Sequence, residues 1–148
     1  MTQGPSDPLV AAYFAVDFQN GVKGAFRECT GLGSESQVVE YRATDERGRP
    51  VLIREPGTMK YNDIVLKRGI TSDMDMWTWR QQVEKGDISG ARRSGTITLY
   101  NQKGEPVAEW TIDAAWPSKL NGPTYDAKTN EVAVEELTIT HHGYRRTK

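Results

Sequence analysis

The sequence predicts a mainly β fold, either a small β-barrel or two packed antiparallel sheets, with one flanking α-helix and a protruding loop arm. Three observations support this prediction. Short segments in which apolar and polar residues alternate recur along the chain, with turn residues between them. One segment has its apolar residues at helical spacing instead. A stretch from Thr44 to Pro56, which begins with charged and turn-forming residues, interrupts the series of strands.

Length and composition exclude several classes of protein. A chain of 148 residues exposes about 7,600 Å² when folded against roughly 24,000 Å² unfolded, so it can bury a core of its own. Its 19 basic and 20 acidic residues give a net charge of −1, whereas dedicated nucleic-acid binders are usually strongly basic. No apolar run approaches the ~18 residues of a membrane-spanning helix, and no basic residue precedes Leu9 as a secretory signal would require. We expect a single domain over residues 1–148, made in the cytoplasm without a membrane anchor.

The N-terminal half is expected to form four strands of the barrel, which as a whole spans about residues 13–142. Phe14, Val16 and Phe18 share one face of the first strand. Asn20-Gly21 is a strong hairpin turn after it, because both residues tolerate positive φ. Pro56-Gly57 is expected to close the arm as a turn. The four strands are expected at about 13–18, 22–30, 34–42 and 63–68.

One helix is expected from about Asp73 to Lys85. Ser72 is a plausible N-cap with Asp75 three residues later, as in a capping box. Gly86 fits the position after the helix, where a left-handed residue is needed. The residues expected to pack this helix on the sheet are Met76, Trp77, Trp79 and Val83.

The C-terminal half returns to strands. A turn is expected at 101–104, and a loop marked by Pro117 and Pro123 follows the second of these strands. In the last strand the apolar residues change face between Val134 and Leu137. This irregularity predicts either a bulge near Glu135-Glu136 or a strand that is partly buried on both faces. The expected strands are 94–100, 106–115 and 131–141.

The residues that could carry chemistry are better explained structurally, and we predict no catalytic, cofactor or metal site. His141 and His142 are neighbours on a strand, so they point to opposite faces and cannot chelate one ion together; we interpret them as surface or interface histidines. Asp73 and Asp75 fit the first turn of the helix, where the dipole favours carboxylates. Cys29 is the only cysteine, which excludes an intrachain disulfide, and we interpret it as a small buried hydrophobe.

The arm, expected at about residues 44–56, carries the apolar run Val51-Leu52-Ile53 on a segment too short to bury it. An exposed apolar strip on a protruding segment is typical of contact with a partner. The expected subunit-interface residues are Arg47, Arg49, Val51, Leu52, Ile53, Arg54 and Glu55.

Motifs along nearly the whole chain resemble the tube proteins of contractile phage tails and of related contractile injection systems with Hcp-like inner tubes. The sharpest match is PGTMKYNDIVLKRG, from Pro56 to Gly69. GAFRECTGL precedes it, and Trp77-Thr78-Trp79, AWPSK and NEVAVEEL follow it in the expected order, with His141 close behind. The resemblance covers about Phe14 to His141. Cys29 departs from it, because the family more often has serine there.

The resemblance implies a small β-barrel whose homohexameric rings stack into a hollow tube. A contracting sheath would drive this tube through a target envelope, and the lumen would conduct DNA or protein cargo. The implied partners are other copies of the chain, the sheath protein, baseplate or tip and cap proteins, and the cargo; neither catalysis nor a cofactor is implied. The tube would belong to a phage tail or a phage-tail-like particle. Two alternatives stay open: a specialised ring near the baseplate or tip, and a monomeric β-barrel that binds a small ligand.

Overall fold

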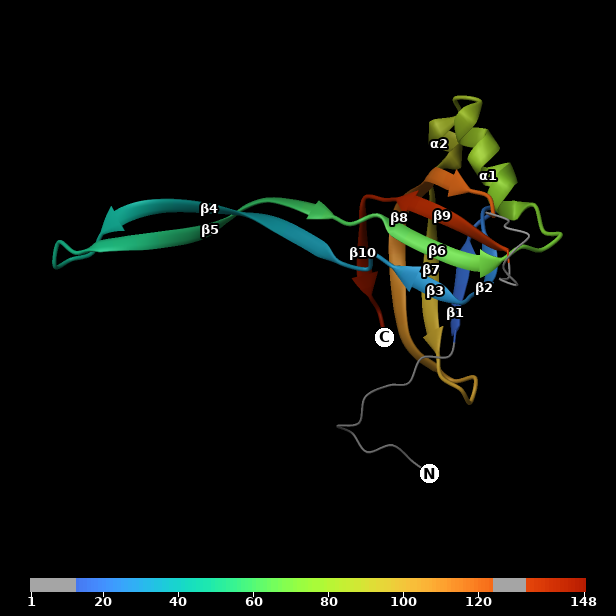
Figure 1. The fold of residues 1–148 in the computed structure, drawn as a ribbon, viewed down its shortest axis with the longest axis horizontal. Helices are drawn as coiled ribbons and strands as arrows, with labels where there is room; N and C mark the ends of the chain where they lie inside the picture. Colours follow the sequence, from blue (N-terminus) through green and yellow to red (C-terminus); the bar gives the residue numbers. More distant parts are fainter. Residues whose placement is uncertain (1–12, 124–132) are drawn as a thin grey trace, which may run out of the picture. The chain divides into compact units, whose positions relative to one another are not determined.

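The computed structural model describes residues 13–123 and 133–148 and contains two compact units (Figure 1). The first unit, here called the core unit, combines the chain up to Leu32 with the chain from Asp63 onward. The second unit, here called the arm, is the continuous segment Gly33–Asn62. The arm is thus inserted into the sequence of the core unit.

The core unit is an eight-stranded antiparallel sheet. Its strands follow the order β2-β1-β7-β8-β9-β6-β3, and β10 pairs with β8 beside this path. Cα atoms of β2 lie within 8 Å of β6, and those of β1 within 8 Å of β3, so the two ends of the curved sheet approach each other. The mainly β fold predicted from the sequence is confirmed. The strands are β1 (Tyr13–Phe18), β2 (Lys23–Phe26), β3 (Glu28–Thr30), β6 (Ile64–Gly69), β7 (Arg93–Tyr100), β8 (Pro106–Asn121), β9 (Val134–Thr140) and β10 (Gly143–Arg146).

The 16-residue strand β8 takes part in both halves of the sheet. Its first part pairs with β7 and β10, and its last part pairs with β9 (Figure 1). The register with β7 shifts between Arg93 and Gly95, next to Ala114, whose φ of 49° is left-handed. Such a bulge bends a strand and increases its twist. The bend in β8 therefore curves the sheet, so that a single sheet can enclose the core.

The interior of the core unit follows from alternation along the strands. Val16 and Phe18 of β1 are fully buried on one face, as predicted. The three buried positions of β6 likewise alternate with half-buried ones. The buried apolar cluster comprises Val16, Phe18, Val22, Phe26, Ile64, Leu66, Met76, Trp79, Ala91, Ile97, Ile112, Ala115, Leu137 and Ile139.

Two helices follow β6: α1 (Asp75–Glu84), which was expected, and the four-residue α2 (Ile88–Ala91), which was not. Ser72 is not the N-cap, because the helix begins at Asp75 after Met74, whose side chain makes no cap bond. Gly86 has a φ of 90°, and its N–H donates to the Val83 carbonyl at 2.9 Å, which confirms its predicted position. In the described ranges, neither helix is long and apolar enough to cross a membrane.

Three strand predictions need correction. The expected strand 22–30 is divided into β2 and β3 at Arg27, whose N–H donates to the Lys67 carbonyl at 3.1 Å. Pro117 lies within β8 and not in a loop; the register with β9 shifts just after it, where the ladder tolerates proline. β9 pairs with β6 in unbroken register, so of the two alternatives for this strand the bulge near Glu135-Glu136 is wrong. Its two faces are buried and half-buried, which confirms the other alternative. Residues 131 and 132 of the expected last strand lie outside the described residues.

The arm is a β-hairpin of β4 (Ser34–Thr44) and β5 (Pro50–Tyr61), so it is longer than the predicted loop at 44–56. The strand expected at 34–42 pairs with β5 of the arm and not with the sheet. Pro56-Gly57 is not a turn: it lies inside β5, where the register shifts opposite Gln37. At the base of the hairpin, the Asn62 N–H donates to the Gly33 carbonyl at 3.0 Å.

Candidate interaction surface

The register of the hairpin sorts the side chains of the arm into two faces, because opposite residues of an antiparallel pair point to the same side. Three consecutive pairs on one side are Val39 with Glu55, Tyr41 with Ile53, and Ala43 with Val51. We call this side the apolar face. The other side, here the mixed face, carries the pairs Val38 with Pro56, Glu40 with Arg54, Arg42 with Leu52, and Thr44 with Pro50.

Large side chains of the apolar face are exposed. Val39 is 50% exposed, and Tyr41 and Val51 are exposed as well. A two-stranded hairpin is only marginally stable in water, and contiguous exposed apolar side chains mark an interaction site. The arm therefore has the properties of a segment that another molecule covers.

Several charged side chains of the arm have a partner within it. Arg54 Nε lies 3.0 Å from Glu40 Oε1, and the Tyr41 hydroxyl donates to Glu55 Oε1 at 3.1 Å. The arm is electrically balanced, so its partner surface need not be strongly charged. It carries five acidic and five basic residues: Glu35, Glu40, Asp45, Glu46 and Glu55 against Arg42, Arg47, Arg49, Arg54 and Lys60.

Asp45 organises the tip of the hairpin. Its Oδ1 accepts the backbone N–H groups of Arg47 at 2.9 Å and of Arg49 at 2.8 Å, and its Oδ2 accepts from Arg49 Nε at 3.1 Å. These bonds, led by the one from the Arg49 backbone, lower the pKa of the Asp45 carboxyl below its usual value. Arg47 and Arg49, expected at an interface, thus lie in a turn that the arm itself stabilises.

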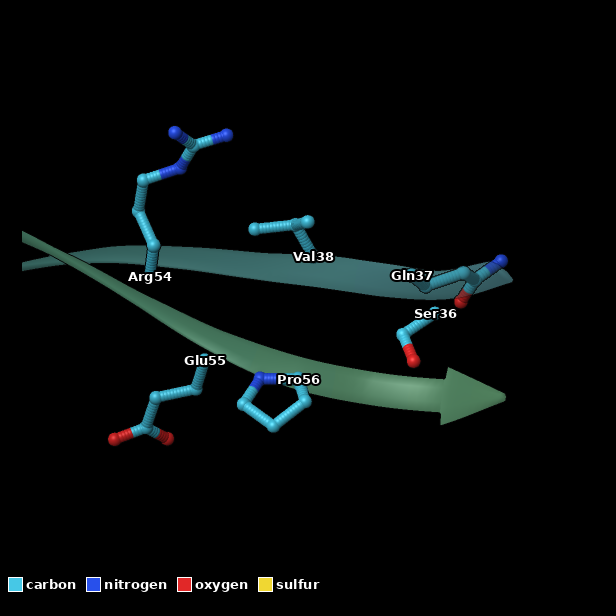
Figure 2. Close-up of a pocket in the computed structure, with 6 residues that line it drawn as sticks. All are labelled: Ser36, Gln37, Val38, Arg54, Glu55 and Pro56. Atoms are coloured by element: carbon cyan, nitrogen blue, oxygen red, sulfur yellow. The ribbon is translucent and has the colours of Figure 1, made fainter. Parts of the chain in front are cut away.

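A hollow of about 370 Å³ lies beside the register shift in the arm. Figure 2 shows Arg54 and Val38 on one side of the ribbon and Glu55 on the opposite side. The polar groups around this hollow therefore do not converge on one point, as those of a small-ligand site do. The lining residues are Ser36, Gln37, Val38, Arg54, Glu55 and Pro56.

The structure divides the expected interface residues between the two faces. Val51, Ile53 and Glu55 lie on the apolar face, whereas Leu52 and Arg54 lie on the mixed face. Sequence reasoning missed Val39 and Tyr41, because it assigned 34–42 to the barrel. The signal was present in the sequence, since alternate residues of that segment are apolar and match those of the opposite strand.

The four residues expected to pack the helix occupy two environments. Met76 and Trp79 are fully buried, and Trp77 and Val83 are partly buried against the same core. Trp79 Nε1 donates to the Ala91 carbonyl at 2.7 Å, which ties α1 to α2. Both tryptophans thus combine apolar packing with a hydrogen bond.

A buried ion cluster that sequence reasoning missed joins α1 to the sheet. Arg68 of β6 forms an ion pair with Asp75 of α1, and its Nε lies 3.7 Å from Glu135 Oε2 of β9. Trp77 Nε1 donates to Glu135 Oε1 at 2.8 Å, and the guanidinium of Arg68 lies over the ring of Phe26 at 5.1 Å. The sequence did contain a signal for this cluster. Buried and half-buried residues alternate along both strands, and Glu135 of β9 and Arg68 of β6 stand at buried positions of that alternation.

The residues considered for catalysis or metal binding have environments that explain them structurally. Burial raises the pKa of the Cys29 thiol to about 12, so it is not a thiolate near neutral pH. His141 is buried, contrary to the surface interpretation, and its Nδ1 accepts from the Gly143 N–H at 3.0 Å; His142 is exposed. Within the described part of the chain, no three His, Cys, Asp or Glu side chains could hold a metal ion together.

The chain is similar in sequence and in fold to tube proteins of phage tails and contractile injection systems. The model of a family described as "T4-like virus tail tube protein gp19" matches residues 10–145. No curated protein matches the chain. A chain in the cryo-EM structure of an extracellular contractile injection system, the PVC sheath-tube complex in its extended state, is 25% identical with a TM-score of 0.78, and the match covers 97% of this chain and 93% of that chain.

Two further solved structures show the same fold at lower identity. A chain in the anti-feeding prophage cap (AFP tube terminating cap) is 23% identical with a TM-score of 0.77, and the match covers 100% of this chain and 96% of that chain. Hcp1 from Flavobacterium johnsoniae is 13% identical with a TM-score of 0.56, and the match covers 92% and 95% of the two chains.

Proposed function

The chain belongs to the T4-like virus tail tube protein family, and we propose that it is a structural subunit of the inner tube of a contractile injection system. Six copies form a ring, and the rings stack into a hollow tube. Contraction of a sheath drives the tube through a target envelope, and the lumen conducts DNA or protein cargo. The partners are other copies of the chain, the sheath, baseplate or tip and cap proteins, and the cargo. The protein acts by assembly and not by catalysis.

One observation carries this proposal beyond family membership: the arm has an apolar face with exposed side chains. In an assembled subunit, neighbouring copies cover such a face. In a monomeric protein, the same exposed apolar face would promote aggregation. The net charge of −1 per chain is also suitable, because a ring of six carries about −6 and stacked rings repel each other weakly.

A second place in the same machine is supported by the solved structures that the fold matches. The fold also matches a chain in the structure of a tube terminating cap, at nearly full coverage of both chains. The alternative is therefore a specialised ring at one end of the tube. The position of the chain in intact particles, located by labelling a C-terminal tag for electron microscopy, separates the two: label along the whole tube supports the main tube protein, and label at one end supports the specialised ring.

The test is the assembly state of the full chain, measured by negative-stain electron microscopy and sedimentation velocity. We expect rings or tubes, and tubes inside sheaths when the sheath protein is added. A chain that stays monomeric at high concentration in several salts, and that binds a small apolar ligand saturably, would instead support the monomeric barrel.

A variant without the arm tests the role of that segment. Ser34–Tyr61 can be replaced by a short Gly/Ser linker, because Gly33 and Asn62 are already joined by a backbone hydrogen bond of 3.0 Å. We expect the circular dichroism of a folded β protein and the loss of rings. Normal tubes from this variant would contradict an assembly role for the arm, and an unfolded variant would show that the core unit depends on the arm.

A further inference from the structure

The core unit also exposes large apolar side chains, and two of them lie in one short segment. Ile70 is 52% exposed and Met74 is 62% exposed, both in the connection from β6 to α1. We call residues 70–74 the connecting segment. The only other exposed large apolar residues among the described part of the core unit are Tyr13 and Ile88, which lie on different elements.

The connecting segment is held in place by its own hydrogen bonds. The Ile70 N–H donates to the Ala133 carbonyl at 3.0 Å, and the Asp73 N–H donates to Thr71 Oγ1 at 3.2 Å. The Met74 carbonyl accepts the Thr78 N–H at 2.9 Å in the first turn of α1. A backbone fixed in this way presents Ile70 and Met74 at little further cost in conformational entropy when a partner binds.

The arm provides a complementary surface. Its apolar face contains Val39, Tyr41, Ala43, Val51 and Ile53, and the one carboxylate among its pairs, Glu55, accepts a hydrogen bond from the Tyr41 hydroxyl. Most of this face is apolar, and it gains most from apolar side chains on the partner, because burying apolar surface costs no hydration of a charge. Ile70 and Met74 offer that chemistry.

We propose that the apolar face of the arm of one copy docks on the connecting segment of a second copy. This inference rests on the proposed function, which supplies neighbouring copies. The 12-residue strand β5 is about 40 Å long at ~3.3 Å per residue. A compact unit of about 120 residues has a radius of gyration near 14 Å. The arm of one copy is therefore long enough to cross the core unit of another.

The geometry favours this contact over pairing between two arms. Two arms that cover each other's apolar faces form a closed, isologous dimer and leave Ile70 and Met74 exposed. A contact between two different surfaces of the same chain is heterologous, and it repeats until a ring closes or a stack grows. Only the heterologous contact continues into a tube.

The first test compares matched substitutions. Val39→Ser removes an apolar side chain from the apolar face, and Val38→Ser removes the same side chain from the mixed face, where Val38 is 54% exposed against 50% for Val39. The pair Ile70→Ser and Met74→Ser, made together, is compared with Ile88→Ser, which alters an exposed residue of α2. Sedimentation velocity and electron microscopy report the concentration needed for assembly, and circular dichroism checks folding.

We expect Val39→Ser and the Ile70/Met74 double variant each to raise the assembly concentration at least tenfold, whereas Val38→Ser and Ile88→Ser change it less than threefold. If the wild-type chain assembles and the Ile70/Met74 double variant assembles equally well, the inference is wrong while the proposed function stands. If the wild-type chain does not assemble at all, both are wrong.

The second test identifies the occupant directly. One population carries Tyr41→Cys and another carries Met74→Cys with a mass tag. Both also carry Cys29→Ser, because Cys29 is a free, half-buried cysteine that could otherwise react. We expect a disulfide between the two populations under an added oxidant only when they are mixed. A disulfide between two Tyr41→Cys chains would show arm pairing, and one within a chain that carries both substitutions at monomer concentrations would show docking inside one copy; either result overturns the inference.

Discussion

Removing the Glu135 carboxylate is expected to destabilise the core unit strongly. Glu135 is 1% exposed, and it lies between Arg68 Nε, 3.7 Å from its Oε2, and Trp77 Nε1, which donates to its Oε1 at 2.8 Å. In Glu135→Ala, the guanidinium keeps only Asp75 as a counter-charge and Trp77 loses its acceptor. Leaving one partner of a buried ion pair unmatched costs about 3–5 kcal/mol.

The expected loss is about 3 kcal/mol, at the lower end of that range, because Asp75 still neutralises Arg68. For a chain of this length, each kcal/mol shifts Tm by about 2–4 °C, so Glu135→Ala should melt about 6–12 °C lower. Glu135→Gln keeps the shape but can accept a hydrogen bond from only one neighbour, since its NH₂ group must then face the other donor. We expect it to cost about 1–2 kcal/mol.

Urea unfolding followed by circular dichroism, at a concentration where the chain is monomeric, measures these free energies. A double-mutant cycle with Arg68→Met and Glu135→Leu isolates the interaction between the two side chains. The double variant should be less destabilised than the sum of the single variants, because apolar residues of similar size leave no unpaired charge. A Glu135→Ala variant within 0.5 kcal/mol of wild type would refute this account of the cluster.

The remaining predictions concern three other positions. Trp79→Ala should cost about 3–5 kcal/mol in thermal melts and Trp77→Ala less, because Trp79 is fully buried and Trp77 only partly; equal, negligible shifts would contradict the packing of α1. Because the pKa of Cys29 is about 12, the folded protein at pH 8 should react with iodoacetamide far more slowly than the urea-unfolded protein. The same raised pKa predicts that the stability contributed by Cys29 is complete below the pKa of the unfolded thiol and is lost as pH rises toward 12. An NMR titration should give Asp45 a pKa below the usual 3.8, so the tip it stabilises loosens as pH falls through that lowered value; a pKa at or above 3.8 would count against the turn described here.

Alternation predicted the strands with regular burial well. Val16 and Phe18 were placed on the buried face of the first strand, and the structure buries both. Gly86 was predicted to end the helix because a left-handed residue is needed there and glycine adopts that conformation without strain. Such features depend on residues close together in the chain, which is why the sequence alone was sufficient.

The pairing of strands depends on distant residues and was predicted less well. The segment 34–42 alternates like any half-buried strand, and nothing local shows that its partner is β5 and not the sheet. The buried face of β9 was not recognised because it includes the charged residue Glu135. The residue that explains its burial, Arg68, lies on another strand. The candidate interaction surface was therefore found only in part: Val51 and Ile53 were expected, whereas Val39 and Tyr41 were not.

The bonded base of the arm limits how its length can evolve. Gly33 and Asn62 are joined directly, so residues can be added to the hairpin without moving its attachment. Side chains alternate with a period of two, however, and one extra residue in each strand would turn the apolar face to the opposite side. Apart from bulges such as the one opposite Gln37, arms that keep the same docking face grow by two residues in each strand, a step of about 6.6 Å. Family members that share this mode of docking should therefore differ in arm length by multiples of four residues, and the spacings they set between subunits should form a discrete series.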